Sequence, residues 1–316
     1  MDRLPAAKHR HHLADYVELL CLTNADLEFS SADLVDRLLE RSDVGEDATE
    51  EGDEPEPGEA PAAREDRLRR IAEDTFTHLA YRQGVFGRGY PFRLEGDNVL
   101  RRVSQVTRRR KLYVFLLLAS SLRYVNRTPY QSQLEKSFER LATEALRRLL
   151  PSDAEVHPFG TAASGGRYRG RAWLRYERLA KDLRDHPLLE ETNFPINSVG
   201  DLGLDSVAWL PSGDDIAPMM TFFAQSTCTV EWRGKQSESR RWETYLHALA
   251  PRGNFLFVPF CFRLPNGQWY DLTWVYDGVV IDRLRLLWIF RGSAVDLEEV
   301  PYDLVDASLA QREALV

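Results

Sequence analysis

Two apolar runs joined by a turn-forming segment constrain this chain more than any other stretch does. The runs cover residues 207–210 and 218–224, and the segment between them, 211–215, contains proline, glycine and aspartate. Such residues favour turns, so the stretch predicts a β-hairpin. Asp205 begins the first strand, and Gln225 lies near the end of the second.

An acid at the entrance to a buried strand is costly to desolvate unless it has a partner. Asp205 either caps the turn that follows Gly203 or takes part in a functional site. Gln225 either hydrogen-bonds to neighbouring backbone or offers its side-chain carbonyl to a ligand. Side chains alternate along a strand, so Gln225 shares one face with Phe223 and Thr227.

The charge of the chain is concentrated in one segment. The formal net charge is -8, but nine acids and no Lys or Arg lie between residues 43 and 59. The remainder is close to neutral, so the low isoelectric point does not exclude a polyanionic partner. Residues 42–63 contain few apolar side chains, and we expect a flexible loop there.

Helical periodicity dominates the first part of the chain, whereas helices and strands alternate in the second. We expect a helical N-terminal domain over residues 1–128 and a mixed α/β domain over 129–316. In the second, residues 131–150 and 173–183 have helical patterns, 255–262 forms a continuous apolar run typical of a buried strand, and 241–249 is expected to be helical.

The apolar run at 112–122 is too short to span a bilayer and predicts a buried helix. The first twelve residues are polar and basic and lack the apolar core of a signal peptide. The three cysteines are widely spaced and indicate neither a disulfide framework nor a metal site. We expect a cytoplasmic protein without a membrane partner.

Several other motifs have both a functional and a structural interpretation. The basic run 108–111 could contact a phosphate backbone or form the solvated face of a helix. His9, His11 and His12 could form a metal cluster, but a solvated segment is the simpler expectation. The basic loop at 160–170 matches no phosphate-binding pattern. Cys228 has no nearby histidine in sequence, and Trp209, Trp232 and Trp242 are expected in the core.

Three positions together resemble the PD-(D/E)XK nuclease superfamily, whose fold is restriction-endonuclease-like. These are Phe138-Glu139 on a helix, Gly203-Leu204-Asp205 at the start of a strand, and Gln225-Ser226-Thr227 on its neighbour. The closer resemblance is to bacterial nuclease-like proteins linked to defence against phage or mobile DNA. It implies an α/β fold, with a mixed sheet flanked by helices and preceded by the helical domain.

The resemblance also implies a chemistry. Hydrolysis of a phosphodiester uses a divalent cation, here Mg²⁺ or Mn²⁺, to neutralise the phosphate and lower the pKa of the attacking water. Asp205, Gln225 and Glu139 would be its ligands, since magnesium takes only one or two carboxylates. The partner would be nucleic acid, most simply DNA, with a protein partner on the helical domain as a further expectation.

One position departs from the pattern. Thr227 stands where the superfamily has a catalytic lysine, and Lys235 is the nearest lysine along the chain. Two hypotheses follow. The protein is an active nuclease in which Lys235 reaches into the site, or it is a nuclease-fold subunit that binds nucleic acid or a protein without turnover.

Overall fold

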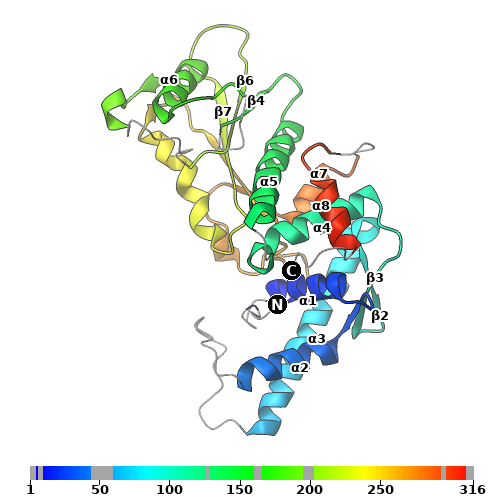
Figure 1. Cartoon of the computed structure of the whole chain (residues 1–316). Coiled ribbons are helices and arrows are strands. Elements are labelled where there is room, and N and C mark those ends of the chain that lie inside the picture. The colour runs from blue at the N-terminus through cyan, green and yellow to red at the C-terminus, as the bar shows by residue number, and fades with distance from the viewer. Residues whose placement is uncertain are drawn as a thin grey trace. The chain divides into compact units, whose positions relative to one another are not determined.

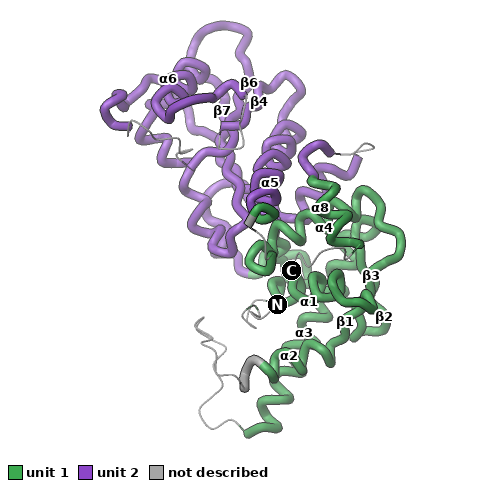
Figure 2. The backbone as a smooth tube through the Cα atoms, in the orientation of Figure 1, with its two compact units in different colours: residues 1–131, 260–270, 301–316 green, residues 132–259, 271–300 purple. Residues whose placement is uncertain are grey.

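The computed structural model describes residues 5, 10–43, 60–125, 128–159, 166–194, 203–292 and 297–310. These residues form a mixed α/β fold with two compact units (Figures 1 and 2). Unit 1 comprises residues 1–131, 260–270 and 301–316, and unit 2 comprises 132–259 and 271–300. The expected division at 128/129 therefore differs from the observed one mainly at the C-terminal end, where two segments belong to unit 1.

Unit 1 is mostly helical and carries one small antiparallel sheet of strand order β1-β3-β2. Its elements are α1 (Arg10–Thr23), β1 (Glu28–Ser30), α2 (Ser31–Asp43), α3 (Pro61–Phe86), η1 (Gly87–Gly89), β2 (Phe92–Glu95), β3 (Val99–Arg102), α4 (Arg108–Ser120), η2 (Leu122–Tyr124) and α8 (Tyr302–Leu309). The ends of the expected acidic loop, 42–43 and 61–63, lie in α2 and α3, and 44–59 lies outside the described residues.

Two helices of unit 1 are buried on all sides. In α4 every residue from Leu112 to Ser120 is buried, and α1 is buried almost throughout. A helix that is apolar all round belongs in a core, as expected for the run at 112–122. Among the helices that the structure describes, none has the length and apolar character needed to cross a membrane.

The C-terminal helix α8 packs against α4 within unit 1. The ammonium of Lys111 forms an ion pair with Asp306 at 2.6 Å, and Arg102 donates a hydrogen bond to the carbonyl of Leu309. These contacts explain why residues 301–316 belong to the helical unit. They also use Lys111 of the basic run, whose neighbour Arg110 donates to the carbonyl of Tyr90.

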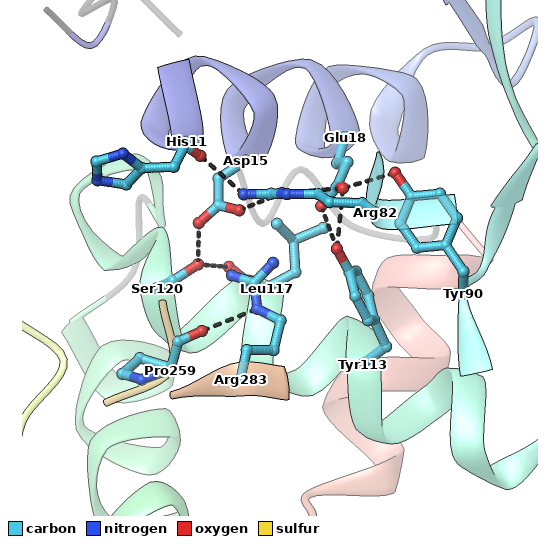
Figure 3. A network of polar contacts seen from close by, with 10 residues as sticks. All are labelled: His11, Asp15, Glu18, Arg82, Tyr90, Tyr113, Leu117, Ser120, Pro259 and Arg283. Carbon is cyan, nitrogen blue, oxygen red and sulfur yellow. Dashed lines mark hydrogen bonds and ion pairs between the residues drawn. The ribbon is translucent and has the colours of Figure 1, made fainter. Parts of the chain in front are cut away.

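A buried ionic network connects α1 to α3 (Figure 3). The guanidinium of Arg82, which is fully buried, contacts Asp15 at 2.6 Å and Glu18 at 2.9 Å. Glu18 also accepts hydrogen bonds from the hydroxyls of Tyr90 and Tyr113 at 2.7 and 2.9 Å. Burial opposes the charge of Arg82, but the two carboxylates outweigh it and raise its pKa.

The expectation that the N-terminal histidines are solvated is wrong for His11. His11 is buried in α1, and its ring lies 4.1 Å from that of His12 and 5.2 Å from that of Tyr270. The helix begins at Arg10, so this part of the expected basic tail joins the core. His9 lies outside the described residues.

Unit 2 is built on a five-stranded sheet of order β10-β9-β7-β6-β4. Its elements are α5 (Thr128–Leu149, entering from unit 1), β4 (Glu155–Pro158), α6 (Ala172–Leu183), β5 (His186–Pro187), η3 (Glu191–Asn193), β6 (Ser206–Leu210), β7 (Met220–Ser226), η4 (Trp232–Glu243), β8 (Leu246–His247), β9 (Gly253–Phe257), η5 (Leu272–Trp274), β10 (Val279–Ile281) and α7 (Arg283–Ile289). The pairs β4–β6 and β6–β7 are antiparallel, whereas β7–β9 and β9–β10 are parallel.

The hairpin β6–β7 is the one expected from the sequence, and helices cover both faces of the sheet around it. Ser206 meets Thr143 of α5 at 2.6 Å between hydroxyl oxygens. Val207, the next residue, belongs to a core with Phe223, Tyr176 of α6 and Trp242. Successive residues point to opposite faces, so α5 lies on one face and α6 on the other.

The segment expected to be helical at 241–249 is different. Residues 232–243 form the 3-10 helix η4, and Leu246–His247 is a short strand paired with β5. The buried residues Gln236, Ser239 and Trp242 recur every third residue, which is the period of a 3-10 helix. An expectation based on a period of 3.6 misses this pattern.

Candidate functional site

The two principal candidate residues lie together at one end of the β6–β7 hairpin. The register pairs Ser206 with Ala224, which brings Asp205 and Gln225 to adjacent positions. The amide of Asp205 donates to the carbonyl of Ala224 at 3.0 Å. Its carboxylate accepts from the amide and the hydroxyl of Ser226 at 2.7 and 2.9 Å. Asp205 is thus anchored to both neighbours of Gln225.

The side chain of Gln225 is buried, with an exposed fraction of 8%, and only half of its amide is satisfied. Its Nε2 donates to Oε2 of Glu238 at 2.6 Å. Because an ionised carboxylate can only accept, this contact identifies the NH₂ end of the amide. The carbonyl oxygen Oε1 has no hydrogen-bond partner within the described part of the chain. A buried carbonyl of this kind costs free energy unless it binds something.

Glu238 joins Gln225 to the expected lysine. The ammonium of Lys235 donates to Oε1 of Glu238 at 2.9 Å, three residues apart on η4. Burial acts to raise the pKa of Glu238, but the hydrogen bonds from Gln225 and Lys235 outweigh it and lower that pKa. Lys235 therefore reaches Gln225 through this carboxylate.

Glu139 lies on α5, the helix that is tied to β6 by Thr143 and Ser206. Its carbonyl accepts a hydrogen bond from the Thr143 hydroxyl at 3.1 Å, and the residue is half-buried. Thr143 is one helical turn beyond Glu139, so Glu139 shares its side of the helix. The Phe-Glu pair thus belongs to the helix that packs beside the start of β6.

A second acid of α5, Glu135, acts on Cys228, which follows the hairpin. Burial raises the pKa of its thiol well above the ordinary value, and the negative charges of Glu135 and Asp205 raise it further. Glu135 precedes Glu139 by one turn on the same helix face. The thiol is protonated at neutral pH and is a poor nucleophile.

Thr227, at the position of the absent lysine, is engaged locally. Its amide donates to the carbonyl of Phe257 at 3.0 Å, which continues the β7–β9 pairing, and its hydroxyl accepts from the amide of Thr229 at 3.3 Å. Its hydroxyl can position a water but cannot supply a positive charge. The cation nearest to Gln225 in the hydrogen-bond chain is Lys235.

The atoms that could bind a metal ion at this end of the hairpin are oxygens. Within the described residues, no group of three His, Cys, Asp or Glu side chains lies close enough to hold a metal ion. A carboxylate from Asp205 and the amide oxygen of Gln225 fit magnesium, which keeps several waters and takes few protein ligands. They would not form a structural zinc site, which needs four nitrogen or sulfur donors.

The basic loop after β4 is partly neutralised. Arg167 contacts both oxygens of Asp182 at 2.6 Å, and Arg171 lies 3.7 Å from Glu191. Residues 160–165 lie outside the described residues. Trp209, Trp232 and Trp242 are buried, as expected for core residues.

Sequence reasoning identified Asp205 and Gln225 but missed Glu238 and Ser226. The i, i+3 spacing of Lys235 and Glu238 was a usable signal, since such pairs meet on a helix. That Glu238 faces Gln225 could not be read from the sequence, because the two residues are thirteen positions apart on different elements, β7 and η4. In comparisons with known proteins, no protein-family model, curated protein or solved structure matches this chain.

Proposed function

We propose that this protein is a divalent-metal-dependent nuclease that hydrolyses phosphodiester bonds, with DNA as its substrate, in bacterial defence or in a mobile element. The proposal rests on the resemblance of Phe138-Glu139, Gly203-Leu204-Asp205 and Gln225-Ser226-Thr227 to PD-(D/E)XK motifs. The comparisons neither add to it nor oppose it.

The observation that carries the proposal is the carbonyl oxygen Oε1 of Gln225. This oxygen is buried and has no partner among the residues that the structure describes. The two neighbours of Gln225 along β7, Ala224 and Ser226, both hydrogen-bond to Asp205. Amide and carboxylate oxygens are the ligands that a hard cation prefers. Structural packing alone would favour a satisfied amide at this position.

The element order of unit 2 supports the finer part of the proposal, a restriction-endonuclease-like fold. A helix, α5, precedes the antiparallel strands β4, β6 and β7, and the chain then crosses over through η4 to the parallel strand β9. In this order Asp205 stands immediately before β6, and Gln225 lies on the neighbouring strand β7.

The proposed chemistry assigns a role to each residue. A bound divalent cation would neutralise the phosphate and activate the attacking water. Asp205 and Gln225 would hold that cation from two adjacent strands. Glu139 lies on α5, on the face of the sheet opposite the Gln225 side chain, and would bind the cation or orient the water from the side of Ser226. Ser226 keeps the Asp205 carboxylate in place through two hydrogen bonds.

A second candidate function is a nuclease-fold subunit that binds nucleic acid without cutting it. Thr227 occupies the position of the lysine, and the charge of Lys235 is paired with Glu238 at 2.9 Å. A cation paired in this way stabilises developing negative charge less than a lysine aimed at the phosphate. This observation favours binding without turnover.

A cleavage assay separates the two functions. Plasmid DNA incubated with Mg²⁺ or Mn²⁺ should be nicked by the wild-type protein and spared by Asp205→Asn, which keeps an oxygen that can accept from Ser226. Asp215→Asn in the exposed turn of the same hairpin is the control and should cut normally.

Equal nicking by wild type and Asp205→Asn would contradict the proposed site. Absence of nicking by all three proteins, with DNA retained in a gel-shift assay, would establish the second function instead. Absence of both nicking and binding would overturn both.

A further inference from the structure

We propose that Glu238, held by Lys235, is a positioning residue that fixes the amide of Gln225 so that its carbonyl oxygen faces the divalent cation. This inference rests on the proposed function and deepens it. It assigns roles to two residues of η4 that lie outside the motifs on β6 and β7.

A glutamine side chain is nearly symmetric about its amide. Its amide has nearly the same shape after a rotation of 180°, which exchanges the oxygen with the NH₂ group. Only the hydrogen-bond partners select one orientation. The Oε2 of Glu238, 2.6 Å from Nε2, accepts a hydrogen bond and offers none, so it selects the orientation with Oε1 turned away from Glu238.

Glu238 is itself held in place. Its other carboxylate oxygen accepts from Lys235 at 2.9 Å, and its side chain is mostly buried, with an exposed fraction of 18%. Both oxygens are therefore occupied by donors on different elements, one on β7 and one on η4. A carboxylate held from both sides cannot rotate away from Gln225 without losing a hydrogen bond.

Glu238 also lies against the motif glycine. Gly203 has a positive φ of +75°, and a Cβ built on it would lie 3.2 Å from Cβ of Glu238 and 3.4 Å from its backbone oxygen. A side chain at position 203 would both strain the backbone and press on Glu238. The glycine two residues before Asp205 thus admits Glu238 beside the hairpin.

Glu238 also acts on Gln225 electrostatically. A glutamine at this position brings one negative charge fewer than a glutamate would. The Glu238 carboxylate supplies a negative charge one hydrogen bond away from the cation's ligand. It also polarises the amide of Gln225, so that Oε1 becomes a better metal ligand. Carboxylates behind metal-binding histidines act in the same way, and losing one costs about 10- to 100-fold in metal affinity.

The test is a charge exchange between the two side chains. In Glu238→Gln the new amide still accepts from Lys235 and presents its NH₂ group to Gln225. Gln225 must then turn its oxygen toward position 238 and its NH₂ group toward the cation. We expect Mn²⁺ affinity, followed by electron paramagnetic resonance of the free ion, to fall at least about tenfold.

The double variant Gln225→Glu with Glu238→Gln exchanges donor and acceptor and keeps the hydrogen bond. One oxygen of the new carboxylate at 225 is then free for the cation. We expect this variant to recover the Mn²⁺ affinity lost in Glu238→Gln. The control Glu243→Gln removes the same charge from an exposed site on η4 and should bind Mn²⁺ as the wild type does.

Each outcome decides the inference. Mn²⁺ binding by Glu238→Gln that equals that of Glu243→Gln, or a double variant no better than Glu238→Gln, would overturn it, with circular dichroism melts verifying that every variant is folded. If the wild type binds Mn²⁺ no better than Asp205→Asn, the proposed function fails and the inference with it. If Asp205→Asn alone abolishes binding, the proposed metal site stands and the role of Glu238 falls.

Discussion

At the scale of single residues, both units bury polar or charged side chains, but their hydrogen-bonding groups are satisfied differently. In unit 1, Arg82 faces two carboxylates that also take hydrogen bonds from two tyrosines and a serine (Figure 3). In unit 2, the amide of Gln225 is satisfied at one end only. In unit 1 two carboxylates balance the buried cation, which is typical of structural stabilisation, although Nε of Arg82 has no partner among the described residues. In unit 2 the open position is a carbonyl oxygen, which can bind a ligand.

The ionic network predicts a large effect at Arg82. Arg82→Met leaves Asp15 and Glu18 buried beside each other without their cation, and breaking a buried ion pair from one side costs about 3–5 kcal/mol. We expect the free energy of unfolding, measured with urea, to fall by about that amount. Arg88→Met, at an exposed arginine of η1, should change it by less than about 0.5 kcal/mol. Similar stabilities for the two variants would show that the network contributes nothing.

At the scale of elements, the hairpin is held by the helix that carries Glu139. The hydroxyls of Thr143 and Ser206 are buried and share one hydrogen bond of 2.6 Å. This bond connects α5 to the first residue of β6, immediately after Asp205. The tie sets the position of the helix beside the strand, on the face of the sheet opposite the side chain of Gln225.

The tie predicts coupling between the two positions. Thr143→Val leaves the Ser206 hydroxyl buried without its partner and should cost about 1–3 kcal/mol of unfolding free energy. Adding Ser206→Ala removes the orphaned group, so the double variant should be less destabilised than the sum of the single ones. Urea denaturation of the four proteins measures the coupling. Strict additivity would mean that the two hydroxyls do not interact.

At the scale of the whole molecule, both units bury acids that hold their protons. Burial raises the pKa of the Cys21 thiol from 9.0 to about 12, and also raises the pKa of Tyr90 and Tyr168. These groups titrate at their ordinary values once the chain unfolds. The folded protein therefore binds more protons than the unfolded one at alkaline pH.

Because the folded state binds more protons than the unfolded state, the free energy of unfolding should fall at alkaline pH. The stabilisation is complete below about pH 9 and declines as the pH rises toward 12, by about 1.4 kcal/mol per pH unit for each proton released. Urea melts between pH 8 and 10.5 should show the decline. Cys21→Val should show a shallower slope, because one of these protons is absent. An equal slope would mean that the Cys21 thiol already ionises in the folded protein.

Patterns among neighbouring residues were enough to predict most local elements and the two residues at the hairpin end. Apolar runs, turn residues and alternation depend on neighbours a few positions apart, so the hairpin, the buried helix expected at 112–122 (which ends at Ser120) and the adjacent positions of Asp205 and Gln225 were predictable. The helix expected at 241–249 was wrong, because the 3-10 helix η4 ends at Glu243 and Leu246–His247 pairs with β5.

Which distant groups meet depends on how the elements pack in three dimensions. Two segments of the C-terminal part join unit 1, through contacts such as that between Lys111 and Asp306, and Glu238 lies against Gln225. Neither contact can be recognised from the spacing of residues in the sequence, because each joins residues that only packing brings together. The buried oxygen of Gln225, which has no partner among the residues that the structure describes, is likewise a property of its surroundings, and it is where the chemistry of this chain is to be tested.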